Sequence, residues 1–169
     1  MICQERDKRS VITVSPLIQI LNMKKVFISL LTVVVASASL CAQKSATFIE
    51  SGKAIKGYDP VAYFTAGKPV KGNDGFKFSW NKADWYFSSQ QNLDLFKANP
   101  EKYAPQYGGY CAYGLSDGHK APTDNNAWTI VDNKLYLNYS LDVKKEWSKD
   151  IKGRIEKANK NWPEIKNKE

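Results

Sequence analysis

The chain has 169 residues and a formal net charge of +8, and 43% of its residues are hydrophobic. This length and composition suit one folded domain with short extensions. The positive charge comes mainly from dispersed lysines, without the basic and aromatic pattern of nucleic-acid-binding proteins, so no nucleic-acid partner is expected.

The first 42 residues have the layout of an export signal. Two lysines precede an apolar run that is shorter than the ~20 residues of a membrane span, and small residues follow it. We predict a signal peptide at residues 23–42, with residues 1–22 as an upstream extension outside the true protein. The mature protein is then exported, either periplasmic or secreted, with no stable membrane span. Cys41 offers a lipoprotein reading instead, but bulky Leu40 stands where a lipid-attachment signal normally has a small residue.

The mature chain is predicted to begin with an arm. Residues 43–56 are weakly patterned, and we place the domain at residues 57–165. Its first element is a short helix, because Asp59 suits an N-cap, Pro60 the first helical position and Gly67 the stop.

Two hairpins are predicted from runs of alternating apolar and polar residues. The first turn is expected at residues 81–84. The second contains Asn133, which tolerates a positive φ. The four strands are expected at residues 76–80, 85–87, 127–131 and 135–139.

Helices are expected between the hairpins and at the C-terminus. Ser88 or Ser89 can cap a helix that ends at Pro100, and one more turn follows it. Ser140 can cap a long C-terminal helix that Pro163 stops. The apolar stripe of this helix has helical spacing; its members are Trp147, Ile151, Ile155, Ala158 and Trp162. The predicted fold class is α+β: a small antiparallel sheet of two hairpins, with short helices and a long amphipathic C-terminal helix.

The loop between residues 103 and 122 holds the candidate site. It contains Cys111, which is the only cysteine left after removal of the leader, and His119, the only histidine. No internal disulfide can then form. A thiolate and an imidazole together with the Asp117 carboxylate suit a transition metal, with copper or zinc expected. The same residues also fit a packed loop with a buried thiol. A Cys–His nucleophile oriented by Asp117 or Asn125 is a third reading, which no sequence signature supports.

The segment from Asp59 to Tyr103 resembles the YHS domain, a short module associated with metal binding. The matching residues include Asp59-Pro60-Val61, Tyr86-Phe87, Phe96, Asn99-Pro100 and Tyr103. The three family cysteines are replaced by Ala62, Ser88 and Asn92. The further patterns at residues 107–111 and 135–139 look like an exported subset of this family.

The resemblance implies a metal-associated scaffold without its thiol ligands. A four-thiolate site cannot form, so any metal would use Cys111 and His119, with Asp117 nearby. The function predicted is that of an exported, non-catalytic module that binds copper or zinc through this loop. The alternative is a metal-free module that binds a ligand or a protein partner. A cysteine-dependent enzyme is the less favoured third possibility.

Overall fold

The computed structural model of the protein describes residues 45–168. The predicted signal peptide, the upstream extension and Cys41 lie outside the described residues. Across the described part of the chain, no helix combines the length and apolarity needed to cross a membrane.

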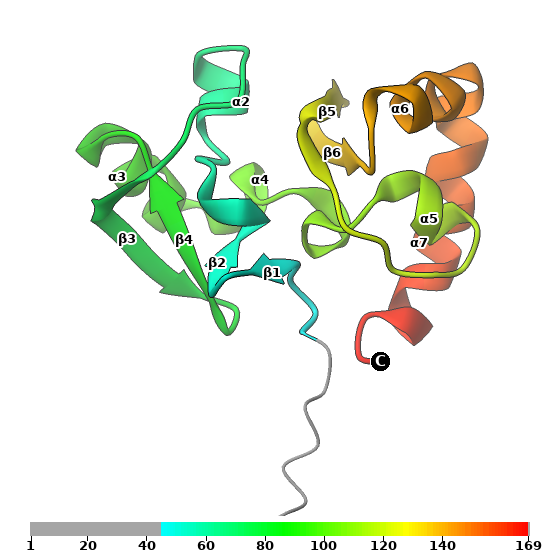
Figure 1. The fold of residues 1–169 in the computed structure, drawn as a ribbon, viewed down its shortest axis with the longest axis horizontal. Coiled ribbons are helices and arrows are strands. Elements are labelled where there is room, and N and C mark those ends of the chain that lie inside the picture. The colour runs from blue at the N-terminus through cyan, green and yellow to red at the C-terminus, as the bar shows by residue number, and fades with distance from the viewer. Residues whose placement is uncertain (1–44, 169) are drawn as a thin grey trace, which may run out of the picture. The chain divides into compact units, whose positions relative to one another are not determined.

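The first sheet has four strands in the order β1-β2-β4-β3 (Figure 1). Strands β3 (Asn73–Trp80) and β4 (Ala83–Phe87) form the first predicted hairpin. The turn is shorter than expected, because Ala83 already pairs with Trp80. Its two residues are Asn81 and Lys82, with φ of 53° and 62°. Positive φ at both turn residues matches the twist of the flanking strands, so the hairpin closes tightly.

The stretch predicted as an arm contributes two strands to this sheet. β1 (Ile49–Glu50) pairs antiparallel with β2 (Lys53–Ala54), and β2 pairs parallel with β4. The chain before β1 is held by Gly108, whose carbonyl accepts a hydrogen bond from the Phe48 N–H at 2.9 Å. A Cβ atom at residue 108 would lie 1.9 Å from the Ala46 oxygen, so this approach requires glycine. Two-residue strands are too short to show an alternating pattern, so the sequence does not predict them.

Four helical segments accompany the first sheet. They are η2 (Ile55–Gly57), α2 (Ala62–Thr65), α3 (Gln90–Ala98) and α4 (Pro100–Tyr103). The predicted Ser89 cap of α3 is confirmed, since its hydroxyl accepts the Asn92 N–H at 3.2 Å. Asn99 caps α4 in the same way, accepting the Lys102 N–H at 3.1 Å. Side-chain acceptors therefore define both helix starts.

The rest of the chain forms a second group of elements (Figure 1). It contains η3 (Gln106–Gly109), α5 (Ala112–Ser116), β5 (Asp124–Val131), β6 (Lys134–Asn138), α6 (Leu141–Trp147), η4 (Ser148–Asp150) and α7 (Ile151–Ile165). β5 and β6 are the second predicted hairpin, and Asn133 in its turn has the expected positive φ, 58°. The α+β class is confirmed. The two hairpins, however, belong to separate sheets rather than to one.

The predicted C-terminal helix is present but interrupted. The Ser140 hydroxyl accepts the Val143 N–H at 3.2 Å, which confirms the cap of α6. The helix then breaks at η4, because Asp150 leaves the helical region at φ −147° and ψ 65°. The Asp150 carboxylate accepts the Gly153 N–H at 3.0 Å and starts α7 anew. The predicted stop at Pro163 is wrong: α7 continues to Ile165, because so near the helix end the missing N–H removes a single hydrogen bond.

Two hydrophobic clusters form the core, and β6 separates them. Side chains alternate along a strand, so Leu135 and Leu137 join the cluster under the first sheet, while Tyr136 joins the other cluster. The second cluster packs α5, α6 and α7 around Trp147, which is fully buried. One short strand thus ties the two halves of the described chain together.

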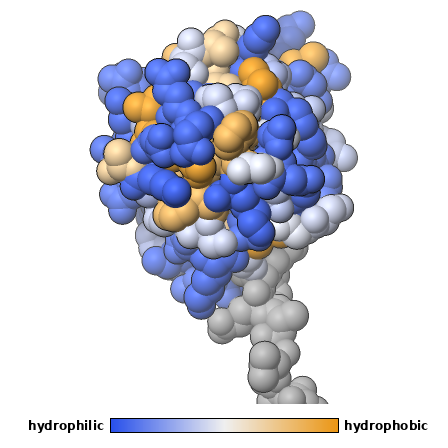
Figure 2. All heavy atoms as spheres, turned by 90° about the vertical axis from the view of Figure 1, so that its left-hand side faces the viewer, coloured by the Kyte–Doolittle hydropathy of each residue, from blue (hydrophilic) through white to orange (hydrophobic). Residues whose placement is uncertain are grey.

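The face that carries β3 and α3 is mainly hydrophilic. Figure 2 shows it with small apolar areas between charged and polar side chains. Scattered apolar residues of this kind are normal on a protein surface. This face therefore gives no sign of a large docking surface.

Candidate functional site

Cys111 lies at the start of α5 and is buried. Its side chain is 1% exposed. The sulfur accepts hydrogen bonds from the backbone N–H of Gly114 at 3.5 Å and of Tyr139 at 3.3 Å. The thiol itself donates to Oδ1 of the fully buried Asn138 at 3.7 Å. The sulfur therefore joins the α5 helix to the end of β6.

The protonation of this thiol follows from its burial. Burial raises the pKa of the Cys111 thiol above its ordinary value, because a thiolate there would lose its hydration. The N–H groups of Gly114 and Tyr139 act against this rise, and the negative Asp117 adds to it. A raised pKa and a closed environment are the opposite of what a nucleophilic cysteine requires.

His119 lies at the surface but contacts the same helix. Its backbone N–H donates to the Gly114 carbonyl at 3.0 Å. Its Nε2 lies 3.2 Å from the point that a Cβ atom at Gly114 would occupy. The Cys111 sulfur also contacts Gly114, so both predicted ligands lie against one glycine.

Asp117 is engaged with α7 instead. Its carboxylate accepts a hydrogen bond from Arg154 at 2.6 Å, in an ion pair. The same guanidinium donates to the Tyr113 hydroxyl and to the Ser116 hydroxyl, both at 2.9 Å. Asp117 therefore links the end of α5 to α7 through Arg154. Asn125, the other residue considered for orienting His119, bonds the Tyr63 hydroxyl through its backbone oxygen at 3.1 Å.

The described residues do not assemble a ligand set for a closed metal site. Between residues 45 and 168, no three histidine, cysteine, aspartate or glutamate side chains come close enough together to hold a metal ion. A structural zinc site normally has four such ligands. Metal binding by Cys111, His119 and Asp117 stays a prediction.

A second cluster forms around Asp59, which is fully buried. One carboxylate oxygen accepts the backbone N–H groups of Val61 at 2.9 Å and Ala62 at 3.3 Å. The other accepts the Ser88 N–H at 2.8 Å, the Ser88 hydroxyl at 2.6 Å and the Asn92 amide at 2.7 Å. Asn92 also donates to the Ser88 hydroxyl at 3.3 Å.

This cluster collects the three positions where the resemblance places cysteines. Residues 62, 88 and 92 all meet the Asp59 carboxylate. The side chains there are a methyl group, a hydroxyl and an amide, and none is the soft thiolate donor that copper(I) or zinc favours. The network does not fit the family's metal. The missing thiols are evident in the sequence at residues 62, 88 and 92, whereas the convergence of these positions on a buried carboxylate is evident only in the structure.

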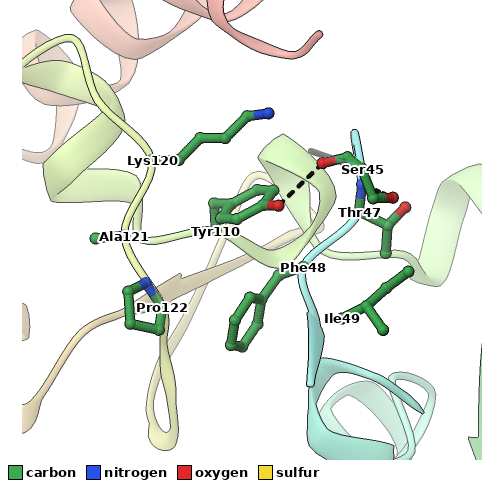
Figure 3. A pocket seen from close by; sticks show the side chains of 8 residues that line it. All are labelled: Ser45, Thr47, Phe48, Ile49, Tyr110, Lys120, Ala121 and Pro122. Carbon is green, nitrogen blue, oxygen red and sulfur yellow. Dashed lines mark hydrogen bonds between the residues drawn. The ribbon is translucent and has the colours of Figure 1, made fainter. Parts of the chain in front are cut away.

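A hollow opens beside the Cys111 loop (Figure 3). Its volume is about 240 Å³, and its walls include Phe48, Tyr110 and Pro122. The Tyr110 hydroxyl donates to the Ser45 carbonyl at 2.9 Å across this region. The hollow is smaller than the 300–1,000 Å³ usual for ligand pockets. It therefore gives no strong indication of a binding site.

The family model of the YHS domain matches residues 61–107. The match covers α2 through the first half of η3, including the three replaced cysteine positions, and ends before Cys111. No curated protein matches the chain, and no solved structure does.

Proposed function

We propose that this chain, which contains a YHS domain at residues 61–107, is an exported, non-catalytic module that binds a ligand without holding a metal ion. The observation that carries the proposal is the Asp59 network. Where the resemblance places thiols, a buried carboxylate receives five hydrogen bonds from residues 61, 62, 88 and 92.

Hydrogen bonds to Asp59 take the place that metal–ligand bonds would have in the cysteine-bearing domain. A metal ion at such a site joins several chain segments, and here hydrogen bonds to Asp59 join them. A buried carboxylate is costly unless it is fully paired, and this one is paired by donors from three segments of the chain. The network thus supports a fold that needs no metal.

Elemental analysis of the protein purified from its export compartment tests this proposal. We expect less than stoichiometric copper and zinc, and an unfolding temperature that a chelator does not change. One equivalent of tightly held metal, with destabilisation on chelation, would overturn it. Detection of the protein in the cytoplasm with residues 23–42 intact would overturn the export part.

A second candidate function is weak copper or zinc binding through Cys111 and His119. The favouring observation is that both side chains lie against Gly114. Copper is the first choice, because thiolate and imidazole suit it. The buried sulfur and the Arg154 pairing of Asp117 weigh against this candidate.

Calorimetric titration with copper(I) and zinc separates the two candidates. The metal candidate requires that Cys111→Ser and His119→Ala each lower metal uptake, whereas Lys152→Ala, on the exposed side of α7, leaves it unchanged. Equal uptake by all four proteins would eliminate the Cys111 and His119 site.

A further inference from the structure

A second cleft, of about 370 Å³, is lined by neither Cys111 nor Asp59. It is lined by segments from both halves of the described chain: the residues before β1, the turn between β3 and β4, the connection from α4 to η3, and the end of α7. Its volume is within the 300–1,000 Å³ usual for small-molecule sites.

Three of the chain's five tryptophans line this cleft. Trp80 and Trp85 come from the first hairpin, and Trp162 comes from α7. Aromatic neighbours hold them in place: the Trp80 ring lies 5.7 Å from the Phe96 ring, and the Trp162 ring lies 5.9 Å from the Tyr107 ring, between centroids. The indole N–H of Trp85 donates to the Trp80 carbonyl at 3.0 Å. The aromatic walls are therefore ordered before any ligand arrives, which lowers the entropic cost of binding.

The cleft has one charged lining residue, and it is a cation. Of the described residues that line it, Lys166 alone has an ionisable side chain. Its backbone carbonyl is occupied, because it accepts a hydrogen bond from Lys120 at 2.9 Å. Its ammonium group makes no ion pair with any residue between 45 and 168, and the side chain lies at the exposed end of α7. The side-chain amides of Asn81 and Asn167 add polar groups at the same cleft.

We propose that this cleft binds a small planar aromatic anion. The partly exposed indoles of Trp80 and Trp162 offer flat apolar contact to an aromatic ring, whereas Trp85 is 1% exposed and supports Trp80. Lys166 offers a positive partner for a carboxylate or a similar group. Within residues 45–168, no acidic side chain lines the cleft to repel such a ligand. The inference rests on the proposed function, because it names the ligand class of that metal-free module.

Titration calorimetry with three probes tests the inference on the protein spanning residues 43–169. The probes are 2-naphthoate, its neutral amide 2-naphthamide, and cyclohexanecarboxylate, which has the charge but no aromatic ring. We expect 2-naphthoate to bind best and to quench the tryptophan fluorescence. The amide should bind about fivefold more weakly, as loss of one exposed ion pair predicts. The non-aromatic acid should bind more weakly than both.

Two matched lysine variants locate the contact. Lys166→Gln should weaken 2-naphthoate binding by about fivefold and leave 2-naphthamide binding unchanged. Lys168→Gln is the control, because Lys168 lies near the same helix end but pairs with Glu164 and does not line the cleft.

Asn81→Gly removes a polar lining group while keeping the positive φ of the turn, and it should weaken the binding of both aromatic probes equally.

The inference is overturned if 2-naphthoate fails to bind at millimolar concentration, if the amide binds equally well, or if Lys166→Gln and Lys168→Gln behave alike. The metal analysis is independent of these titrations. If the protein holds stoichiometric metal and still binds 2-naphthoate, the proposed metal-free state is wrong and the cleft assignment stands. If the protein holds no metal and binds none of the probes, the cleft assignment is wrong and the metal-free state stands.

Discussion

At the scale of single residues, Asp59 is the clearest case of a side chain that organises its surroundings. It is fully buried, yet each of its oxygens accepts hydrogen bonds. Such a carboxylate is stable in the core only because the backbone and side-chain donors replace its lost hydration. The donors come from the start of α2, the end of β4 and the first turn of α3, so a single group joins three elements.

Replacing Asp59 with alanine should therefore destabilise the protein strongly. The change leaves several buried donors without acceptors, and we expect the free energy of unfolding to fall by about 3 kcal/mol or more. Ser88→Ala is the matched control, because it removes one hydroxyl and keeps the Asp59 carboxylate; it should cost about 1 kcal/mol. Urea denaturation measures both. Equal effects of the two substitutions would contradict this view of the network.

Cys111 shows how burial controls one titrating group. The pKa of its thiol is raised in the folded protein, so the unfolded chain releases this proton at a lower pH. The protonated Cys111 thiol therefore stabilises the folded state in full below the ordinary thiol pKa of about 8.5. This stabilisation is lost as the pH rises through the raised pKa of the folded state. Native Cys111 should also react slowly with a thiol reagent and rapidly after unfolding.

The comparison with Cys111→Ala isolates this effect from the tyrosines, which titrate in both proteins. The stability difference between wild type and variant should shrink as pH rises above about 8.5. A difference that is constant with pH, or a thiol that reacts rapidly in the native protein, would show that Cys111 is accessible.

At the scale of elements, the C-terminal helices show how one capping residue divides a continuous apolar stripe. Trp147 ends α6 and Ile151 begins α7, and both contribute to the second cluster. The stripe spacing predicts one helix, because it describes which face is apolar and not whether the axis bends. Asp150 determines the bend, since its carboxylate satisfies the Gly153 N–H that would otherwise need a partner in the preceding turn.

Asp150→Ala should lower the free energy of unfolding by about 1 kcal/mol, the usual value of a lost N-cap. Lys152→Ala, an exposed change two residues further on, should have an effect close to zero and serves as the control. The midpoint of urea denaturation gives both values. If the two variants unfold at the same midpoint, the Asp150 cap contributes nothing to stability.

At the scale of the whole molecule, the YHS segment depends on residues outside its own match. The cluster under the first sheet includes Ile55 from the segment before residue 61, and Leu135 and Leu137 from β6. The Tyr63 hydroxyl donates to the Asn125 backbone oxygen, a further tie between the matched segment and β5. The unit of folding is accordingly larger than the unit of family resemblance.

A fragment of residues 61–107 should for this reason fail to fold alone. It lacks β2 and β6, and so leaves the apolar faces of α3 and β4 uncovered. Circular dichroism and heat denaturation should show no cooperative transition for this fragment and a single transition for residues 45–168. A cooperative transition of the short fragment would contradict the shared core.

Local signals in the sequence predicted much of this fold. The caps at Ser89 and Ser140 and the turn at Asn133 were identified correctly, because each depends on a few neighbouring residues. The partition into two sheets, the strands within residues 49–54 and the site around Asp59 were not identified. These features depend on contacts between distant segments, and local patterns carry no information about them.

The sequence by itself determined the two hairpins, the starts of α3 and α6, the resemblance of residues 59–103 to the YHS domain and the absence of its three cysteines, since these are properties of residue identity and short spacing. It did not predict β1, β2 or the α5 helix within the loop of residues 103–122. Only the tertiary structure decided which groups surround the positions of the missing cysteines, residues 62, 88 and 92. Hydroxyl, amide and backbone donors from separate elements meet one buried carboxylate there, and the Cys111 sulfur is enclosed by the backbone of α5 and β6. The physical reason is that burial and convergence are set by packing between segments far apart in the chain.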